Sequence, residues 1–213
     1  MRTKLFTSPL YRFLNRVADL ICVSLLTLLF SIPVITFFAA ITAAHNVIQD
    51  MIFDTEPTIF RKFWQAFRTN FKQATAAGII VLAVSFIALC NFYWFPGQFS
   101  GMLSTALSIV FGVLLYFILT LSVCIFPLIA RYHNPIAQHL KNAVILCFYA
   151  LPRAFLVTAI NILPLLISIF NPAFLIYTLA FWTFLGPGTT VYLTDLLLRP
   201  IFLRIEARNH NHM

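Results

Sequence analysis

Three long stretches without any Asp, Glu, Lys or Arg dominate this sequence. They contain 30, 58 and 41 residues, at positions 20–49, 73–130 and 154–194. A helix needs about 20 apolar residues to cross the hydrocarbon core of a bilayer, so these stretches can hold several crossings. Only 9% of all residues are charged, whereas soluble domains carry about 25%. The sequence therefore argues against a water-soluble globule and predicts an all-α membrane protein.

We expect residues 1–213 to form a single membrane domain, a polytopic transmembrane helix bundle with about five hydrophobic segments. Residues 95–101 combine one proline, two glycines and two polar residues, a composition typical of a turn, and they divide the second stretch. Asn171-Pro172 divides the third stretch in the same way. The predicted hydrophobic segments are 20–44, 74–95, 102–130, 143–170 and 172–194.

The 14 Lys and Arg residues are confined to the ends of the apolar stretches, although the net charge is +8. They fall at 1–19, 45–73, 131–153 and 195–213. Basic residues concentrated in this way are typical of the cytoplasmic loops of a membrane protein. The distribution favours the lipid bilayer as partner rather than nucleic acid, and it predicts a cytoplasmic C-terminus.

The first apolar segment conflicts with this rule, because four basic residues precede it and four follow it in 45–73. A single crossing of the membrane would put one of these two basic clusters on the side opposite the cytoplasm. Pro33 near its middle offers a second interpretation, in which the segment enters the bilayer and returns with both ends cytoplasmic. The second interpretation is slightly favoured, and the side of the N-terminus stays open. A cleaved signal peptide is the weaker alternative, because the apolar stretch is longer than the usual 7–15 residues.

Two stretches between the segments have the pattern of amphipathic helices. At about 56–73, five aromatic residues recur at helical spacing opposite basic residues, a pattern typical of a helix in the membrane interface. At about 135–151, an apolar side is followed by Leu151-Pro152-Arg153. Both helices are predicted to contact lipid headgroups or a partner protein. The candidate contact residues are Arg61, Lys62, Arg68, Lys72 and Arg153.

Few polar residues lie near the apolar segments, and three of them are candidate intramembrane contacts. Asn91 and Asn161 are expected to form hydrogen bonds between helices, and Asp195 is expected to pair with Arg199 one turn away. Gly186-Pro187-Gly188 interrupts the last segment, which indicates either a simple kink or a binding site of the kind broken helices form in transporters.

No feature of the sequence predicts catalysis, a cofactor or a metal site. The four cysteines stand singly, and the histidines His45, His133 and His139 are expected in loops, with no carboxylate or cysteine near in sequence. Neither a phosphate-binding glycine loop nor a nucleophile motif is present. We therefore predict a protein that is not an enzyme.

The chain resembles the YesL family of bacterial membrane proteins in three stretches. These are residues 8–36 (with SPLYRFL, VADL and SIPVIT), residues 60–75 (FRKFWQAFRTNFKQAT) and residues 128–153 (from LIAR through LKNA to LPR). Where the family usually carries a glycine shortly after Pro-x-x-Thr, this chain has Phe38 and Ala39. The resemblance implies a multi-pass protein of the bacterial plasma membrane, often encoded beside carbohydrate import systems. It implies no catalytic or ligand residues.

Two functions follow as hypotheses. The first is a non-enzymatic accessory or regulatory component of a bacterial carbohydrate ABC import system, favoured by the two basic amphipathic helices and by the scarcity of intramembrane charge. The second is a small transporter or channel that acts on its own, with a polar cavity lined by Asn91, Asn161 and Thr189. The sugar, the partner and the oligomeric state stay open.

Overall fold

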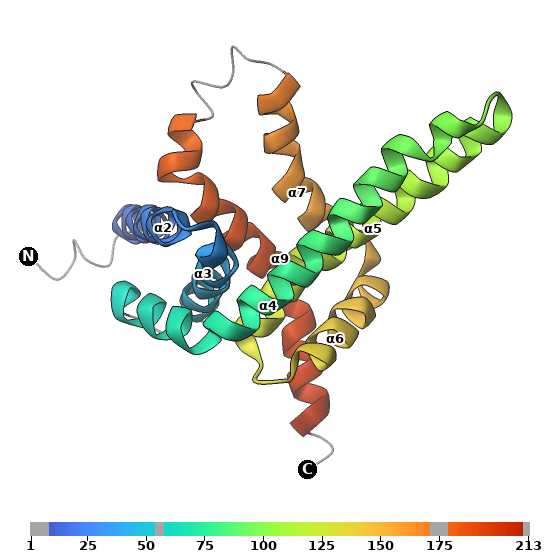
Figure 1. The fold of residues 1–213 in the computed structure, drawn as a ribbon. Coiled ribbons are helices and arrows are strands. Elements are labelled where there is room, and N and C mark those ends of the chain that lie inside the picture. The colour runs from blue at the N-terminus through green and yellow to red at the C-terminus, as the bar shows by residue number, and fades with distance from the viewer. Residues whose placement is uncertain (1–8, 54–57, 171–178, 211–213) are drawn as a thin grey trace, which may run out of the picture.

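The computed structural model describes residues 9–53, 58–170 and 179–210, and this part contains helices and no strand (Figure 1). Four helical stretches are long and apolar enough to cross a membrane, or five when one bent helix pair is counted as a span. The all-α polytopic fold class is therefore confirmed. The helices are α2 (Pro9–Ser31), α3 (Phe37–Ile52), α4 (Ile59–Trp94), α5 (Met102–Arg131), α6 (Ile136–Tyr149), α7 (Leu151–Phe170) and α9 (Gly186–His210).

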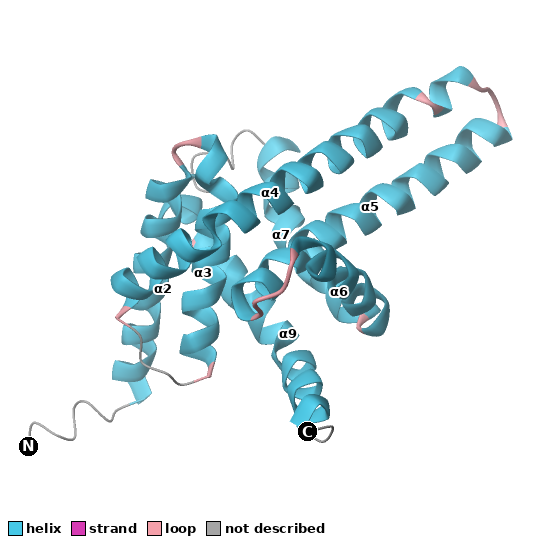
Figure 2. Ribbon diagram, turned by 60° about the horizontal axis from the view of Figure 1, so that its bottom comes forward, coloured by secondary structure: helices cyan, strands magenta, loops and turns pink. Residues whose placement is uncertain are grey.

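The first apolar segment forms a hairpin of two helices instead of one helix. Helix α2 ends at Ser31, a short 3-10 turn follows at Val34–Thr36, and α3 returns along α2 (Figure 2). A hydrogen bond of 2.7 Å from Arg16 Nη1 to the carbonyl of Met51 joins the start of α2 to the end of α3. Pro33 has no amide hydrogen to continue the helix, which explains the break. Both ends of the hairpin thus lie on the same side.

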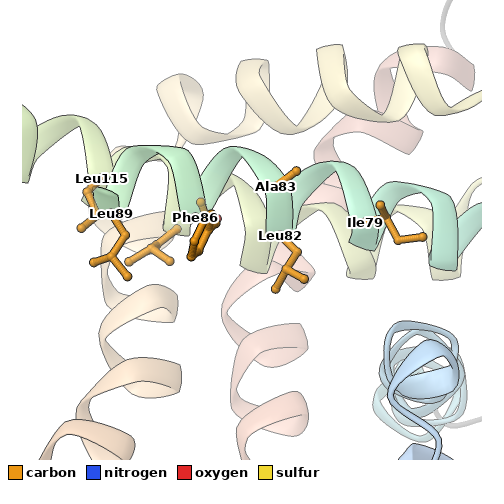
Figure 3. Close-up of a pocket in the computed structure, with 8 residues that line it drawn as sticks. Ile79, Leu82, Ala83, Phe86, Leu89 and Leu115 are labelled. Carbon is orange, nitrogen blue, oxygen red and sulfur yellow. The ribbon is translucent and has the colours of Figure 1, made fainter. Parts of the chain in front are cut away.

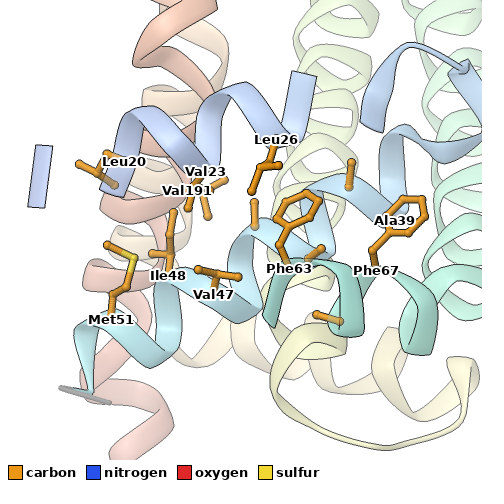
Figure 4. Close-up of a cluster of buried hydrophobic side chains, with 14 of the residues drawn as sticks. Leu20, Val23, Leu26, Ala39, Val47, Ile48, Met51, Phe63, Phe67 and Val191 are labelled. Carbon is orange, nitrogen blue, oxygen red and sulfur yellow. The ribbon is translucent and has the colours of Figure 1, made fainter. Parts of the chain in front are cut away.

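Helix α4 joins two regions that the sequence analysis separated at residue 73. It runs without interruption from Ile59 to Trp94, because nothing between the basic and the apolar half breaks a helix. Phe63 and Phe67, expected in the lipid boundary, are instead buried against the α2–α3 hairpin (Figure 4). Both rings contact that of Phe30 in a tilted arrangement, with centroids 5.5 and 5.0 Å away. Phe60 and Trp64 stay exposed. The amphipathic face is therefore partly a packing face.

Helices α4 and α5 form a second hairpin that extends away from the other helices (Figure 1). The chain turns at Pro96–Gln98 and Gly101, where the sequence predicts a turn, and Gly101 has a φ of 66°. Exposed apolar side chains cover this hairpin, as Figure 3 shows for one shallow groove. Five of its lining residues are Ile79, Leu82, Phe86, Leu89 and Leu115. A surface of this kind suits contact with lipid tails.

The predicted segment 143–170 is divided at Ala150, where α6 and α7 meet at an angle of 107°. Residues 143–149 belong to α6, whose buried residues include Ala143 and Cys147. Ala143, Leu146 and Cys147 pack in one core cluster with residues of α5, whereas Ile145, Phe148 and Tyr149 stay exposed. Helix α7 begins at Leu151, with Pro152 in its first turn, where a missing amide hydrogen costs nothing.

Helix α9 continues well past residue 194, the predicted end of the last segment. The expected turn at Asn171-Pro172 lies outside the described residues, and a short helical stretch at 179–184 precedes α9. Near the start of α9, Gly188 allows close packing on α2. Its amide donates a 2.9 Å hydrogen bond to Ser24 Oγ, and a Cβ added there would lie 2.5 Å from the carbonyl oxygen of Leu20.

One member of each of the four basic clusters lies at the same end of the fold. We call this end the basic face and define it by Arg16, Lys62, Arg131 and Arg199. Lys62 bonds to Asp50 at 2.8 Å, and Arg131 bonds to Glu206 at 2.8 Å. The Arg131 guanidinium also lies 4.2 Å from the centre of the Phe53 ring. The hairpin at Pro33 thus removes the conflict between the first segment and the distribution of basic residues.

The hairpin predicts the sidedness of engineered cysteines. In a chain with its four native cysteines replaced by alanine, Leu10→Cys and Thr58→Cys should react with an impermeant thiol reagent from one side of the membrane. Ser100→Cys, at the α4–α5 turn, should react from the other. Labelling of Leu10→Cys and Thr58→Cys from opposite sides would contradict the hairpin.

Substitution of Gly188 should destabilise the fold, because the new methyl group would collide with the backbone of α2, which cannot move easily. We expect Gly188→Ala to cost about 1–3 kcal/mol, measured as a lower midpoint of thermal unfolding in mild detergent. Gly97→Ala is the matched control, since a Cβ there meets nothing within 4 Å. Equal midpoints for the two variants would refute the close contact.

Candidate functional site

A buried cluster of His45, Gln49 and Asp195 lies between α3 and α9. His45 Nδ1 is 2.9 Å from Asp195 Oδ2, and Gln49 Nε2 donates a 3.0 Å hydrogen bond to Asp195 Oδ1. The side chains of His45 and Asp195 are only 4% and 1% exposed. Both carboxylate oxygens of Asp195 are therefore bonded within the protein, which is what an ionisable group inside a membrane requires.

The cluster lies in the middle of its helices because α3 and α9 both run further than the sequence analysis predicted. His45 follows the start of α3 at Phe37 by eight residues, about 12 Å of helix, and precedes its end at Ile52 by seven. Asp195 follows the start of α9 by nine residues. The predictions that His45 lies in a loop and that Asp195 lies at a segment end and pairs with Arg199 are thus wrong. His139, also expected in a loop, is buried in α6.

Helix α5 is joined to the same cluster through two of its backbone carbonyls. Gln49 Nε2 also donates to the carbonyl of Pro127 at 3.1 Å, and Asn46 Nδ2 donates to that of Ala130 at 2.7 Å. Ala130 belongs to the last turn of α5, where carbonyls have no partner within the helix. The amide of Asn46 therefore caps α5, and α3 is bonded to both α5 and α9.

A cavity of about 460 Å³ lies beside the cluster, and His45 is part of its wall. Because Asp195 occupies Nδ1 of His45, Nε2 is the ring nitrogen left for a molecule in the cavity. Two further lining groups, Ser31 Oγ and Trp182 Nε1, are shielded from solvent and have no hydrogen-bond partner among the described residues. Most of the wall is apolar, with aromatic rings from Phe37, Phe38 and Phe126.

Of the three candidate intramembrane contacts, Asn161 and Asp195 lie at the cavity or the cluster, and Asn91 does not. Asn161 lines the cavity and donates a 3.1 Å hydrogen bond to Thr194 on α9, next to Asp195. Asn91, in contrast, donates to the carbonyl of Ile87 in its own helix at 2.8 Å. The helical interruption lies at Leu185, so residues 186–188 form the first turn of α9, and Pro187 and Thr190 line the cavity.

The five basic candidates lie away from the cavity. Arg61, Lys72 and Arg153 are exposed, Lys62 pairs with Asp50, and the Arg68 guanidinium lies 5.7 Å from the Trp64 ring centre. Their assignment to headgroups or to a partner remains a prediction. Within the described residues, no group of three or more His, Cys, Asp or Glu side chains is arranged to hold a metal ion.

Sequence reasoning missed the pairing of His45 with Asp195, because these residues stand 150 positions apart. A local signal was nevertheless present. Thr42, His45, Asn46 and Gln49 stand at positions i, i+3, i+4 and i+7, which places them along one edge of a helix. Four polar residues on one edge of an otherwise apolar helix indicate contact with polar groups of neighbouring helices.

The cluster predicts a distinct response to substitution of Asp195. Asp195→Ala should lower the free energy of unfolding by about 1–3 kcal/mol, because His45 and Gln49 lose their shared partner while buried. Asp195→Asn should cost less, since its amide oxygen still accepts a hydrogen bond. The measurement is unfolding in mild detergent, with Glu206→Gln as control at a carboxylate that is 38% exposed. Full stability of Asp195→Ala would refute the pairing.

Residues 20–92 match a protein family described as "Protein of unknown function, DUF624". The matched part comprises most of the α2–α3 hairpin and α4, and it includes His45 and Gln49 but not Asp195. It is consistent with the resemblance to the YesL family and assigns no activity. No curated protein and no solved structure matches the chain.

Proposed function

We propose that this chain is a non-enzymatic membrane protein that binds a small molecule in the cavity beside His45 and moves it across the membrane, as a small transporter or channel acting on its own. The observation that carries the proposal is the buried His45–Asp195 pair, whose imidazole lines a cavity within the helix bundle. Ionisable groups inside a membrane are costly, and those that persist usually serve a substrate or ion pathway.

The arrangement of the helices supports the same proposal. In the C-terminal half of α3, hydrogen bonds from Asn46 and Gln49 join α3 to α5 and α9, so the bundle is packed there. Nearer the start of α3, Phe38 and Ile41 line the cavity. The helix is interrupted at Leu185, and Pro187 in the first turn of α9 borders this space, as in transporters whose broken helices form the substrate site.

We propose further that the basic face is cytoplasmic and that the membrane is the bacterial plasma membrane. Basic residues accumulate on the cytoplasmic side of membrane proteins, and the hairpin at Pro33 allows all four clusters to lie on one side. With this orientation the α4–α5 turn at Pro96–Gln98 is extracytoplasmic, and the C-terminus is cytoplasmic.

The second candidate function is an accessory or regulatory component of a bacterial carbohydrate ABC import system. It is favoured by the exposed basic and aromatic residues of the first turns of α4, with Phe60 60% and Trp64 40% exposed beside Arg61 and Arg68. Such a surface suits a cytoplasmic partner protein or the headgroups of anionic lipids. The buried His45–Asp195 pair weakens one argument for this function, which was the scarcity of charge inside the membrane.

Reconstitution of the purified chain alone separates the two functions. In liposomes, uptake of radiolabelled sugars, short carboxylic acids and short alcohols, and proton flux with an internal dye, should reveal at least one permeant solute. Asp195→Asn should reduce that flux at least tenfold, because it changes the partner of the cavity-lining imidazole, whereas Glu206→Gln should leave it unchanged. An accessory subunit would give no flux without its partner, so uniform absence of flux would contradict the first proposal.

A further inference from the structure

The cavity beside His45 offers hydrogen bonds that no described residue satisfies. Trp182 Nε1 can only donate, and Ser31 Oγ can both donate and accept. When Nδ1 of His45 donates its proton to Asp195, Nε2 accepts. Buried polar groups are normally bonded, and leaving one without a partner costs about 1–3 kcal/mol. These groups therefore favour a molecule that carries both a hydrogen-bond donor and an acceptor.

The rest of the wall limits the charge and the polarity of that molecule. Among the described residues that line the cavity there is no Lys, Arg, Asp or Glu. A phosphate or ammonium group would thus lose its hydration without gaining a counter-charge, which is strongly unfavourable. A free sugar carries hydroxyl groups on all its sides, whereas Phe37, Phe38, Phe126 and Ile41 present no polar atom to bond them. Both a charged head and a free sugar fit poorly.

We propose that the cavity binds a small, uncharged, single-chain amphiphile whose hydroxyl head bonds to Trp182, Ser31 or His45. A hydroxyl oxygen can accept from Trp182 Nε1 or from the Ser31 hydroxyl, and a hydroxyl hydrogen can be donated to Ser31 Oγ or to His45 Nε2. The apolar body lies along the phenylalanine rings. This inference rests on the proposed function and gives it a substrate class.

A bilayer phospholipid explains the cavity less well. Only an acyl tail could enter a site without charged residues, and a tail would leave Trp182 Nε1 and Ser31 Oγ without partners. A hydroxylated amphiphile fills the same apolar space and also satisfies these groups. The volume of about 460 Å³ lies in the range of small-molecule sites, about 300–1,000 Å³.

Trp182 allows a direct test, because it is one of three tryptophans and it lines the cavity. A Trp64→Phe/Trp94→Phe variant in nanodiscs of phosphatidylglycerol and phosphatidylethanolamine leaves Trp182 as the only tryptophan. We expect 2-bromoundecan-1-ol, whose bromine lies beside the hydroxyl head, to quench it saturably, undecan-1-ol to reverse the quenching, and undecane to compete poorly. Ser31→Ala should weaken apparent binding about tenfold, by the loss of one buried hydrogen bond.

The matched control is the Trp64→Phe/Trp182→Phe variant, which keeps Trp94, a residue 73% exposed at the end of α4. It reports simple partition of the probe into lipid and should show no saturation. Identical, non-saturable quenching of both reporters would overturn the inference. Competition by undecane as strong as that by undecan-1-ol would also overturn it, since a lipid tail would then suffice.

A second measurement distinguishes failure of the substrate class from failure of the proposed function. In a chain with its native cysteines replaced by alanine, Thr190→Cys places a thiol at the cavity wall. If the alcohol does not bind but a sugar slows modification of this cysteine by a maleimide, only the substrate class is wrong. If no solute that permeates in the liposome assay slows it, the cavity is not the transport site and both proposals fall.

Discussion

The bonding of the Asp195 carboxylate to His45 and Gln49 constrains the positions of the other helices. Lipid offers no hydrogen bonds, so a carboxylate in the middle of a helix must find its donors within the protein. Helix α3 supplies them, and its other amide groups bond to carbonyls at the end of α5. Three helices that are distant in sequence are thereby held in one register, with α3 between the other two.

Close packing of small residues completes what the polar cluster begins. Apolar helices gain little from association in lipid, because lipid tails are as apolar as their side chains. The faces of α3 accordingly carry Ala39, Ala40, Ala43 and Ala44, which have no exposed surface. Gly188 lets α9 approach the backbone of α2. Helices that approach each other this closely contact through backbone and small side chains. Few other arrangements of the helices would fit as closely.

A glycine of α4 makes room for one large side chain of α3. The ring of Phe38 lies against Gly78, and a Cβ on Gly78 would come within 2.2 Å of two ring atoms of Phe38. The Phe38 ring also stacks on Phe126 of α5, so one side chain joins three helices.

The sequence predicted the fold class and the turn at residues 95–101, because both depend on local composition. Charge-free stretches and a cluster of proline and glycine are visible without any tertiary contact. The end of α3 and the bend at Ala150 were not predicted, since each depends on what the helix packs against. Residues 45–52 continue α3 despite their polarity because their polar groups are bonded to α5 and α9. Periodicity alone cannot reveal partners 80 to 150 residues away.

Helix α3 connects the cavity to the basic face. His45 lines the cavity, and Asp50, five residues further along α3, bonds to Lys62 on α4. Lys62 lies among the exposed basic and aromatic residues that suit a partner. A ligand that shifts α3 by repacking against His45 must also shift Asp50, because a helix moves as a rigid unit over so short a distance.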